Sequence, residues 1–200
     1  MRPYYRFMRL LAQGAFVLYF QGRAFGRENV PSSGGVLLAC THQSFFDPIT
    51  ATCALNREGN YMARDTLFLN PLFARLIGSL NAFPVKRGMG DVGAVKETLR
   101  RLKDGKVVVV FPEGTRTRTG HLSPFKKMPF QFAKMAGVPI IPIGMSGLYR
   151  FKRRSSWLLH PGPIKVKFGP PISVADIESH TPEWLQQKVR EAIESLIEFQ

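Results

Sequence analysis

The sequence has 200 residues, of which 44% are hydrophobic, enough for one domain of ordinary size with a substantial core. Lys and Arg number 28 against 14 Asp and Glu, and the formal net charge of +14 attracts anions at long range without selecting among nucleic acid, anionic lipid and phosphorylated metabolites. The only cysteines, Cys40 and Cys53, are too few for a disulfide scaffold and form no Cys-x-x-Cys metal pair.

Residues 1–24 are expected to form an amphipathic helical segment that precedes the main domain of residues 25–200. The chain starts basic and aromatic and is then uncharged from Leu10 to Gly22. A spanning helix needs about 20 predominantly apolar residues, and this stretch is shorter and interrupted by Gln13 and Gly14, so no transmembrane span is predicted. A signal peptide is disfavoured because no Ala-x-Ala cleavage site follows.

This segment has two interpretations. In the first, it is an interfacial helix whose arginines face lipid phosphates while its apolar side chains enter the headgroup boundary. In the second, it is an amphipathic helix packed on the protein's own core. The residues assigned to the interfacial face are Arg2, Arg6, Arg9, Phe7, Leu10, Leu11, Leu18 and the tyrosines Tyr4, Tyr5 and Tyr19.

Short apolar, β-branched runs alternate with helical patterns along the rest of the chain. This alternation is typical of a single α/β domain with a mostly parallel mixed sheet flanked by helices. The expected strands are residues 35–40, 60–63, 81–85, 106–111, 138–143 and 165–168.

Helix starts are indicated by residues with N-capping side chains, most of them followed by proline: Asp47, Asn70, Asp91 and Thr181. The helix after Asp91 is expected to end near Gly105. The last helix places an apolar stripe toward the core, formed by Leu185, Val189, Ala192 and Leu196.

Polar clusters follow four of the predicted strands. In open α/β sheets, ligands bind at the carboxyl ends of the strands, so we expect these clusters to line one crevice. They are His42, the pair Lys86 and Arg87, residues 113–118 and residues 144–146.

The stretch THQSFFDP places His42 five residues before Asp47. Residues five apart on a straight helix diverge by roughly 140°, so a loop must bring these two side chains together. A carboxylate on the imidazole would fix its tautomer and leave the other ring nitrogen to take a proton from a hydroxyl. Considered alone, the pair is better explained as a helix N-cap and an ordinary histidine at a strand end, and it is the neighbouring motifs that reverse this preference.

A second candidate site lies in VFPEGTRTRTG, which follows four valines and carries Arg116 and Arg118 in a glycine-flanked loop. Guanidinium groups suit bidentate recognition of phosphate, and loop amides contribute to anion sites. Arg87 supplies another candidate cation. Taken singly, Arg118, Lys126 and Lys127 fit solvated surface charges better.

From about Phe25 to Ser173, the sequence resembles the glycerolipid acyltransferases of the 1-acylglycerol-3-phosphate acyltransferase (PlsC-like) type. Four motifs occur in the order found in that family, and the first and third together are specific. They are HQSFFD, AFPVKR, FPEGTRT and VPIIPI. Departures from the family pattern are Thr41 where many members have Asn, Asn81 in place of a glycine, and KKMPFQFA without the glycine common there.

The resemblance implies acyl transfer from a thioester to a glycerol hydroxyl by a His-Asp dyad, with no metal, no cofactor and no acyl-enzyme. His42 would be the general base and Asp47 its partner. The residues that it assigns to the glycerol-phosphate site are Arg87, Glu113, Gly114, Thr115 and Arg116, and it places Pro139 of the fourth motif near the crevice.

Three other classes of protein are weighed against this interpretation. GMSGL resembles the nucleophile elbow of a serine hydrolase around Ser146, with Asp176 and His180 following in the appropriate order. Residues 149–157 interleave aromatic and basic side chains, as in a non-enzymatic basic module that binds nucleic acid or a membrane, although no nucleic-acid-binding motif accompanies them, and they suit anionic lipid, a coenzyme A phosphate or an acidic carrier protein equally. The four histidines form no ligand-spaced pair for a metal enzyme.

The sequence therefore predicts a peripheral acyltransferase at the cytoplasmic face of the cell membrane. Its expected acceptor is lysophosphatidic acid, and its expected donor is an acyl thioester, either acyl-CoA or the acylated form of the acyl carrier protein (acyl-ACP). Another lysolipid acceptor, of the phospholipid-remodelling or ornithine-lipid type, is the alternative. An anionic membrane surface is expected as a partner, and nucleic acid is not.

Overall fold

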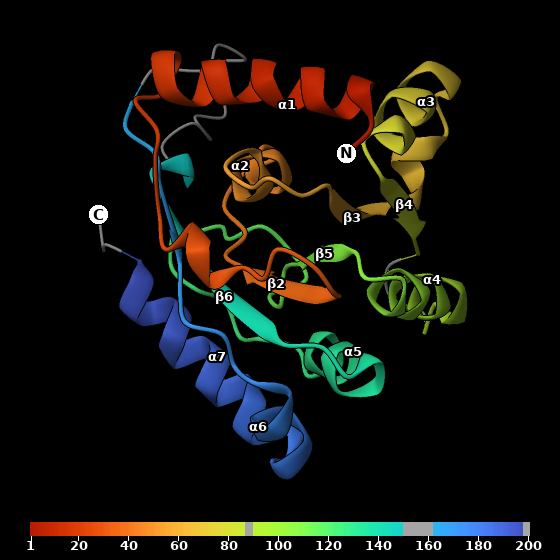
Figure 1. The fold of residues 1–200 in the computed structure, drawn as a ribbon, viewed down its shortest axis with the longest axis vertical. Helices are drawn as coiled ribbons and strands as arrows, with labels where there is room; N and C mark the ends of the chain where they lie inside the picture. The colour runs from red at the N-terminus through yellow and green to blue at the C-terminus, as the bar shows by residue number, and fades with distance from the viewer. Residues whose placement is uncertain (87–89, 150–161, 198–200) are drawn as a thin grey trace.

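The computed structural model describes residues 1–86, 90–149 and 162–197. Within these ranges the chain forms a seven-stranded sheet in the order β1-β7-β6-β2-β5-β3-β4 (Figure 1). Every pair of neighbouring strands is parallel except β6 and β7. The strands are β1 Arg23–Phe25, β2 Val36–Cys40, β3 Gly59–Arg64, β4 Ala82–Val85, β5 Val107–Val110, β6 Ile140–Ser146 and β7 Lys165–Phe168.

Helices connect these strands and flank the sheet. The α-helices are α1 Pro3–Gly14, α2 Asp47–Cys53, α3 Pro71–Ser79, α4 Val92–Lys103, α5 Met128–Ala136, α6 Val174–Ser179 and α7 Pro182–Leu196. The shorter helical segments are the π-helix η1 Ala15–Tyr19, which continues α1, and the 3-10 helices η2 Arg27–Asn29 and η3 Asp65–Phe68.

The predicted fold class and all six predicted strands are confirmed, with some strand ends shifted. The sequence analysis missed β1, which has only three residues and therefore no apolar period long enough to recognise. Because β1 spans Arg23–Phe25, it crosses the predicted division of the chain at residue 24, and that division stays a prediction.

Three of the four predicted helix caps are confirmed, because Asn70, Asp91 and Thr181 each accept a hydrogen bond from the backbone N–H three residues later. Asp47 begins α2 but directs its carboxylate back to the preceding loop. The stripe predicted for α7 is confirmed only in part: Leu185 and Val189 are buried, the third buried residue is Ile193, and Ala192 and Leu196 are only half-buried.

Two apolar layers lie on opposite faces of the sheet. One joins side chains of β2, β5 and β6 to α2, and α1 rests on α2. The other joins the alternate residues of the same strands to α4, α5, α6 and α7. Figure 1 shows the corresponding arrangement, with α1 and α2 on one side of the strands and α4, α5 and α7 on the other. The central strands are therefore buried on both faces, as their continuous valines and isoleucines require.

Helix α1 packs on the domain along one face. The Tyr5 hydroxyl lies 3.2 Å from that of Tyr61 and accepts a hydrogen bond from the Gly59 N–H at 2.9 Å. Two arginines that the interfacial interpretation directs at lipid phosphates bind the protein instead: Arg2, which precedes α1, pairs with Glu58, and Arg9 of α1 donates to the Leu55 carbonyl.

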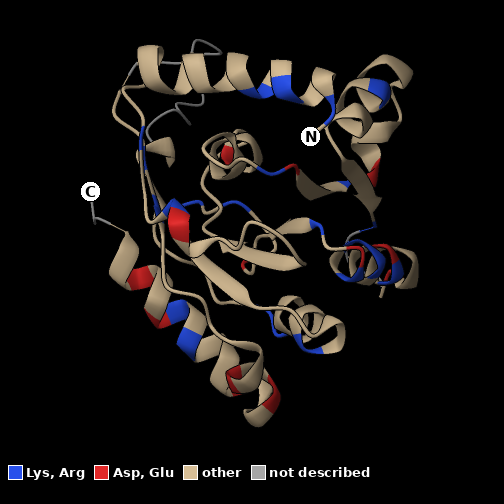
Figure 2. Ribbon diagram, viewed as in Figure 1, with Lys and Arg blue, Asp and Glu red and all other residues tan. Residues whose placement is uncertain are grey.

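Charge is distributed unequally between the two sides of the molecule. Figure 2 shows basic residues, all of them arginines, but no acidic residues on α1, whereas α6 and α7 carry acidic residues. The acidic residues described on these two helices are Asp176, Glu178, Glu183, Glu191 and Glu194.

Candidate active site

The loop between β2 and α2 brings His42 and Asp47 into contact. His42 follows the end of β2 closely, and Asp47 is the first residue of α2. The His42 Nδ1 lies 2.6 Å from the Asp47 Oδ2. The predicted loop contact is therefore present, and the carboxylate requires the proton of a neutral imidazole to reside on Nδ1. Nε2 is then the nitrogen that can accept a proton.

Asp47 is fully buried and collects several donors on one oxygen. Its Oδ2 also accepts the N–H groups of Gln43 at 2.6 Å and Ser44 at 2.8 Å. Burial raises the pKa of the Asp47 carboxyl above its ordinary value, whereas the hydrogen bonds from His42, Ser44 and Gln43 oppose that rise. Three donors on one oxygen favour an ionised side chain that is fixed in orientation.

The imidazole is also held by an aromatic ring that the sequence analysis did not assign to the site. The Phe111 ring stacks on the His42 ring with centroids 4.1 Å apart and an interplanar angle of 20°. Phe111 directly follows β5, the neighbour of β2, so the parallel register places the two rings at the same edge of the sheet. Phe111 is the first residue of the FPEGTRT motif, and this position could have indicated that it belongs to the site.

The loop after β5 brings the third motif beside His42. Glu113 is buried, and its carboxylate accepts the His42 N–H at 2.8 Å. Burial raises the pKa of Glu113, while hydrogen bonds from the backbone of Ser123 and His42 oppose the rise. Thr115 and Arg116 are exposed at the turn, where they are accessible to a ligand.

A glycine is required at position 114 of this loop. Gly114 has a φ of 70°, in the left-handed region that side chains other than glycine rarely adopt. A Cβ there would lie 2.9 Å from the Lys126 Nζ. The Lys126 side chain therefore lies across the turn that carries Arg116, which adds a cation to this loop.

Two residues assigned by the resemblance are not placed at this site. Arg87 lies outside the described residues. Pro139 lies at the opposite edge of the sheet, because its carbonyl accepts the Leu37 N–H at 3.1 Å beside the start of β2, whereas His42 follows the end of β2. The apolar fourth motif forms a buried strand, and the length of that strand separates Pro139 from the crevice.

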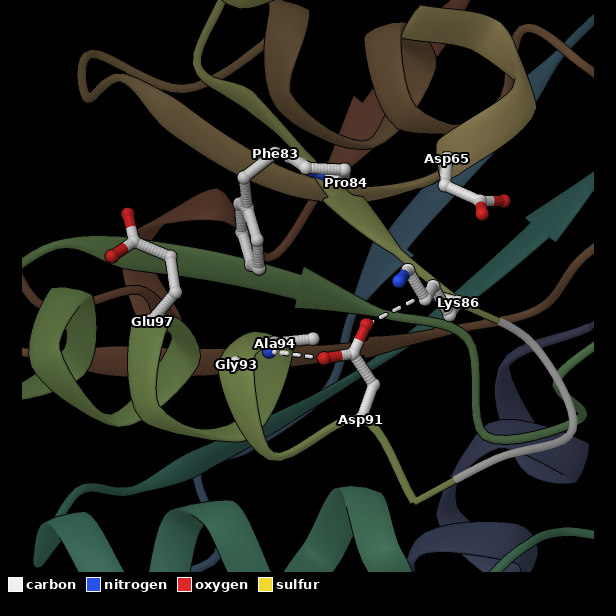
Figure 3. A pocket seen from close by; sticks show the side chains of 8 residues that line it. All are labelled: Asp65, Phe83, Pro84, Lys86, Asp91, Gly93, Ala94 and Glu97. Carbon is white, nitrogen blue, oxygen red and sulfur yellow. Dashed lines mark hydrogen bonds between the residues drawn. The ribbon is translucent and has the colours of Figure 1, made fainter.

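The second motif ends at a separate hollow after β4. This cavity has a volume of about 300 Å³, and Lys86 and Asp91 are among the residues that line it (Figure 3). The Asp91 carboxylate accepts the N–H groups of Lys86 at 2.8 Å and Ala94 at 3.0 Å. Three strand spacings separate β4 from β2, about 14 Å at ~4.8 Å each, so this hollow and His42 share the sheet edge without touching.

The serine-hydrolase alternative is contradicted by the positions of its three residues. Ser146 ends β6, whereas Asp176 and His180 follow Ile172, which bridges Ile140 at the start of β6. The strand spans about 20 Å between these ends at ~3.3 Å per residue. Most of the basic and aromatic run of residues 149–157 lies outside the described residues.

A profile of the family described as Acyltransferase matches residues 23–146. A protein of Bacillus subtilis named 1-acyl-sn-glycerol-3-phosphate acyltransferase is 31% identical over 179 residues, which are 84% of this chain and 86% of that protein. The chloroplastic enzyme of that name from Brassica napus is also 31% identical, and the chain covers 53% of its length.

Among solved structures, the 1-acyl-sn-glycerophosphate acyltransferase PlsC from Thermotoga maritima is similar to this chain. The TM-score is 0.81 and the sequence identity 27%, and the match covers 96% of this chain and 77% of that chain.

Proposed function

The chain belongs to the acyltransferase family, and we propose that it transfers a fatty acyl group from an acyl thioester to the free hydroxyl of 1-acylglycerol-3-phosphate. The product would be phosphatidic acid. The observation that carries the proposal is the His42 Nδ1 held 2.6 Å from the buried Asp47 carboxylate, beside a loop that presents Arg116.

The geometry supports a direct transfer. His42 Nε2 takes the proton of the acceptor hydroxyl while the hydroxyl oxygen attacks the thioester carbonyl carbon. The tetrahedral intermediate then expels the thiolate, which receives the same proton from the imidazolium. Asp47 stabilises the imidazolium between these two steps. General base assistance of this kind contributes about 10² to 10⁴-fold.

The donor is proposed to be acyl-CoA or acyl-ACP, and no cofactor is consumed. A thioester is already an activated acyl group, so the protein needs to supply only a base, orientation and stabilisation of the oxyanion. Because the hydroxyl attacks the thioester directly, no acyl-enzyme is formed.

The acceptor phosphate is proposed to bind the loop after β5. Arg116 would pair with the phosphate, Lys126 adds a nearby positive charge, and Gly114 and Thr115 shape the turn. Arg87 is retained as a proposed phosphate ligand on the resemblance alone. Phosphate recognition favours lysophosphatidic acid over lysolipids without an exposed phosphate monoester.

The activity test uses purified protein, labelled acyl-CoA or acyl-ACP, and a panel of acceptors. The proposal predicts labelled phosphatidic acid from lysophosphatidic acid, with slower transfer to lysophosphatidylcholine and to a lyso-ornithine lipid. Faster acylation of either of the latter would assign the acceptor to another lysolipid. Absence of transfer to every acceptor from both donors would overturn the proposal.

An anionic membrane surface is the proposed partner of α1, η1 and α3. Among the described residues, none of the helices reaches the length and hydropathy that a bilayer crossing requires. Large apolar side chains are nevertheless exposed on these three elements: Tyr4, Phe7, Leu10, Leu11, Val17, Leu18, Tyr19, Leu72 and Leu76. With basic but no acidic residues, α1 suits the anionic boundary of a bilayer. The cytoplasmic face is proposed because the acyl donors are cytoplasmic.

Vesicle binding tests this surface. Leu18 is 84% exposed on η1, and Met135 is 56% exposed on α5, which packs on the other face of the sheet. Leu18→Glu is expected to lower co-sedimentation with phosphatidylglycerol vesicles severalfold, while Met135→Glu leaves it unchanged. Equal losses for the two variants would contradict the assignment of this surface.

A further inference from the structure

We propose that Glu113 is a positioning residue that holds the main chain of His42, rather than a ligand of the acceptor. This role rests on the proposed function of His42 as the base. Its Oε1 accepts the His42 N–H at 2.8 Å, and its Oε2 accepts the Ser123 N–H at 3.0 Å. The residue is 5% exposed. Both oxygens are therefore directed at the protein backbone.

The same loop holds the other side of the His42 residue. The Thr117 N–H donates to the His42 carbonyl oxygen at 2.8 Å. The N–H of His42 is thus bound by Glu113 and its C=O by Thr117, while its ring stacks on Phe111. Three contacts from the segment after β5 fix both the backbone and the ring of the proposed base.

Two buried carboxylates together fix the start of the catalytic loop. Three consecutive backbone N–H groups, those of residues 42, 43 and 44, donate to carboxylate oxygens. Glu113 takes the first, and Asp47 takes the next two while also binding the imidazole. Glu113 thereby fixes the position of the His42 main chain, and Asp47 fixes the orientation of the His42 ring.

The charge of Glu113 argues for the same role. A carboxylate next to the phosphate of an acceptor would repel it, whereas a carboxylate that receives two backbone N–H groups forms two charge-assisted hydrogen bonds. A glutamine at this position offers one acceptor and one amide donor. The donor would face a backbone N–H, so a neutral side chain of the same shape cannot reproduce both contacts.

The test compares Glu113→Gln with Glu191→Gln, the same change on the exposed side of α7. We expect Glu113→Gln to lower kcat about 10² fold, since misplacement of a catalytic group by about 1 Å costs that much. The KM for lysophosphatidic acid should stay within about threefold, because no acceptor contact is lost. Glu191→Gln should change neither value. A raised KM with an unchanged kcat would overturn the proposal and make Glu113 an acceptor ligand.

A second measurement works without turnover and without the variant. Amide hydrogen exchange of the wild-type protein should show the His42 and Ser123 N–H groups protected, and addition of lysophosphatidic acid should leave both rates unchanged. Faster exchange at both amides on addition of the lipid would show that the acceptor displaces Glu113, which contradicts the proposal. Because this readout needs no acyl transfer, it tests the positioning role of Glu113 separately from the proposed acyltransferase function.

Discussion

Two aspartates near the carboxyl-terminal edge of the sheet make similar backbone contacts in different environments. Asp47 accepts the N–H groups of Gln43 and Ser44 after β2, and Asp91 accepts those of Lys86 and Ala94 after β4 (Figure 3). Asp47 is buried and also binds the His42 imidazole, whereas Asp91 is only half-buried and caps α4.

The pKa values of these two aspartates shift in opposite directions. Burial raises the pKa of Asp47, while the backbone N–H groups of Lys86 and Ala94 lower that of Asp91. An aspartate that only accepts backbone N–H groups, as Asp91 does, has a structural role. A carboxylate becomes the partner of a base when the fold also buries it against a titratable ring.

The largest effect is expected from removal of the group that distinguishes the two sites. His42→Ala should lower kcat by about 10² to 10⁴-fold, because the proton acceptor is lost. The ring packs on Phe111 at a loop, so the variant should keep its secondary structure by circular dichroism. Near-normal turnover in a folded His42→Ala protein would show that His42 is not the base. Asp47 would then have no catalytic role that distinguishes it from Asp91.

A smaller effect is expected from the cation next to the buried site. Arg116→Ala should raise the KM for lysophosphatidic acid about tenfold with little change in kcat, because a charge-assisted hydrogen bond to the phosphate is lost. Steady-state kinetics with Arg118→Ala as the matched control measures this effect. A fall in kcat alone for Arg116→Ala would place its guanidinium in the transition state.

The sequence predicted much of the fold and of the central pair. The apolar runs set the strands, and the spacing of His42 and Asp47 required the loop that the structure contains. Contacts between distant segments were not predictable from local patterns, which explains why the stacking of Phe111 on His42 was missed. Pro139 was assigned to the crevice by its motif. It directly precedes β6, whose first residue lies beside the start of β2, so Pro139 lies at the end of the sheet opposite to His42.

The smallest effects are expected in the pH dependence of stability. The folded pKa of Asp91 lies below its ordinary value of 3.8, so its stabilisation is present above pH 3.8 and is lost as the pH falls through the lowered pKa. The folded pKa of Asp47 lies above 3.8, so ionisation costs stability as the pH rises from 3.8 through the raised pKa.

Urea unfolding of Asp47→Asn, Asp91→Asn and the wild type between about pH 3 and 7 measures this difference. As the pH falls, the wild type should gain stability relative to Asp47→Asn and lose it relative to Asp91→Asn. Parallel pH profiles for the two variants would contradict the opposite environments assigned to these carboxyls.

The most direct test of the central claim is the kcat for acyl transfer to lysophosphatidic acid by Asp47→Asn and Asp91→Asn in one assay. The neutral amide introduced by Asp47→Asn would no longer stabilise the imidazolium of His42, whereas the amide introduced by Asp91→Asn keeps a side-chain oxygen that can cap α4. We predict that kcat falls by at least about 10² fold in Asp47→Asn and stays within about threefold of wild type in Asp91→Asn. Equal rates in the two variants would contradict the account of a buried carboxylate that orients the catalytic histidine.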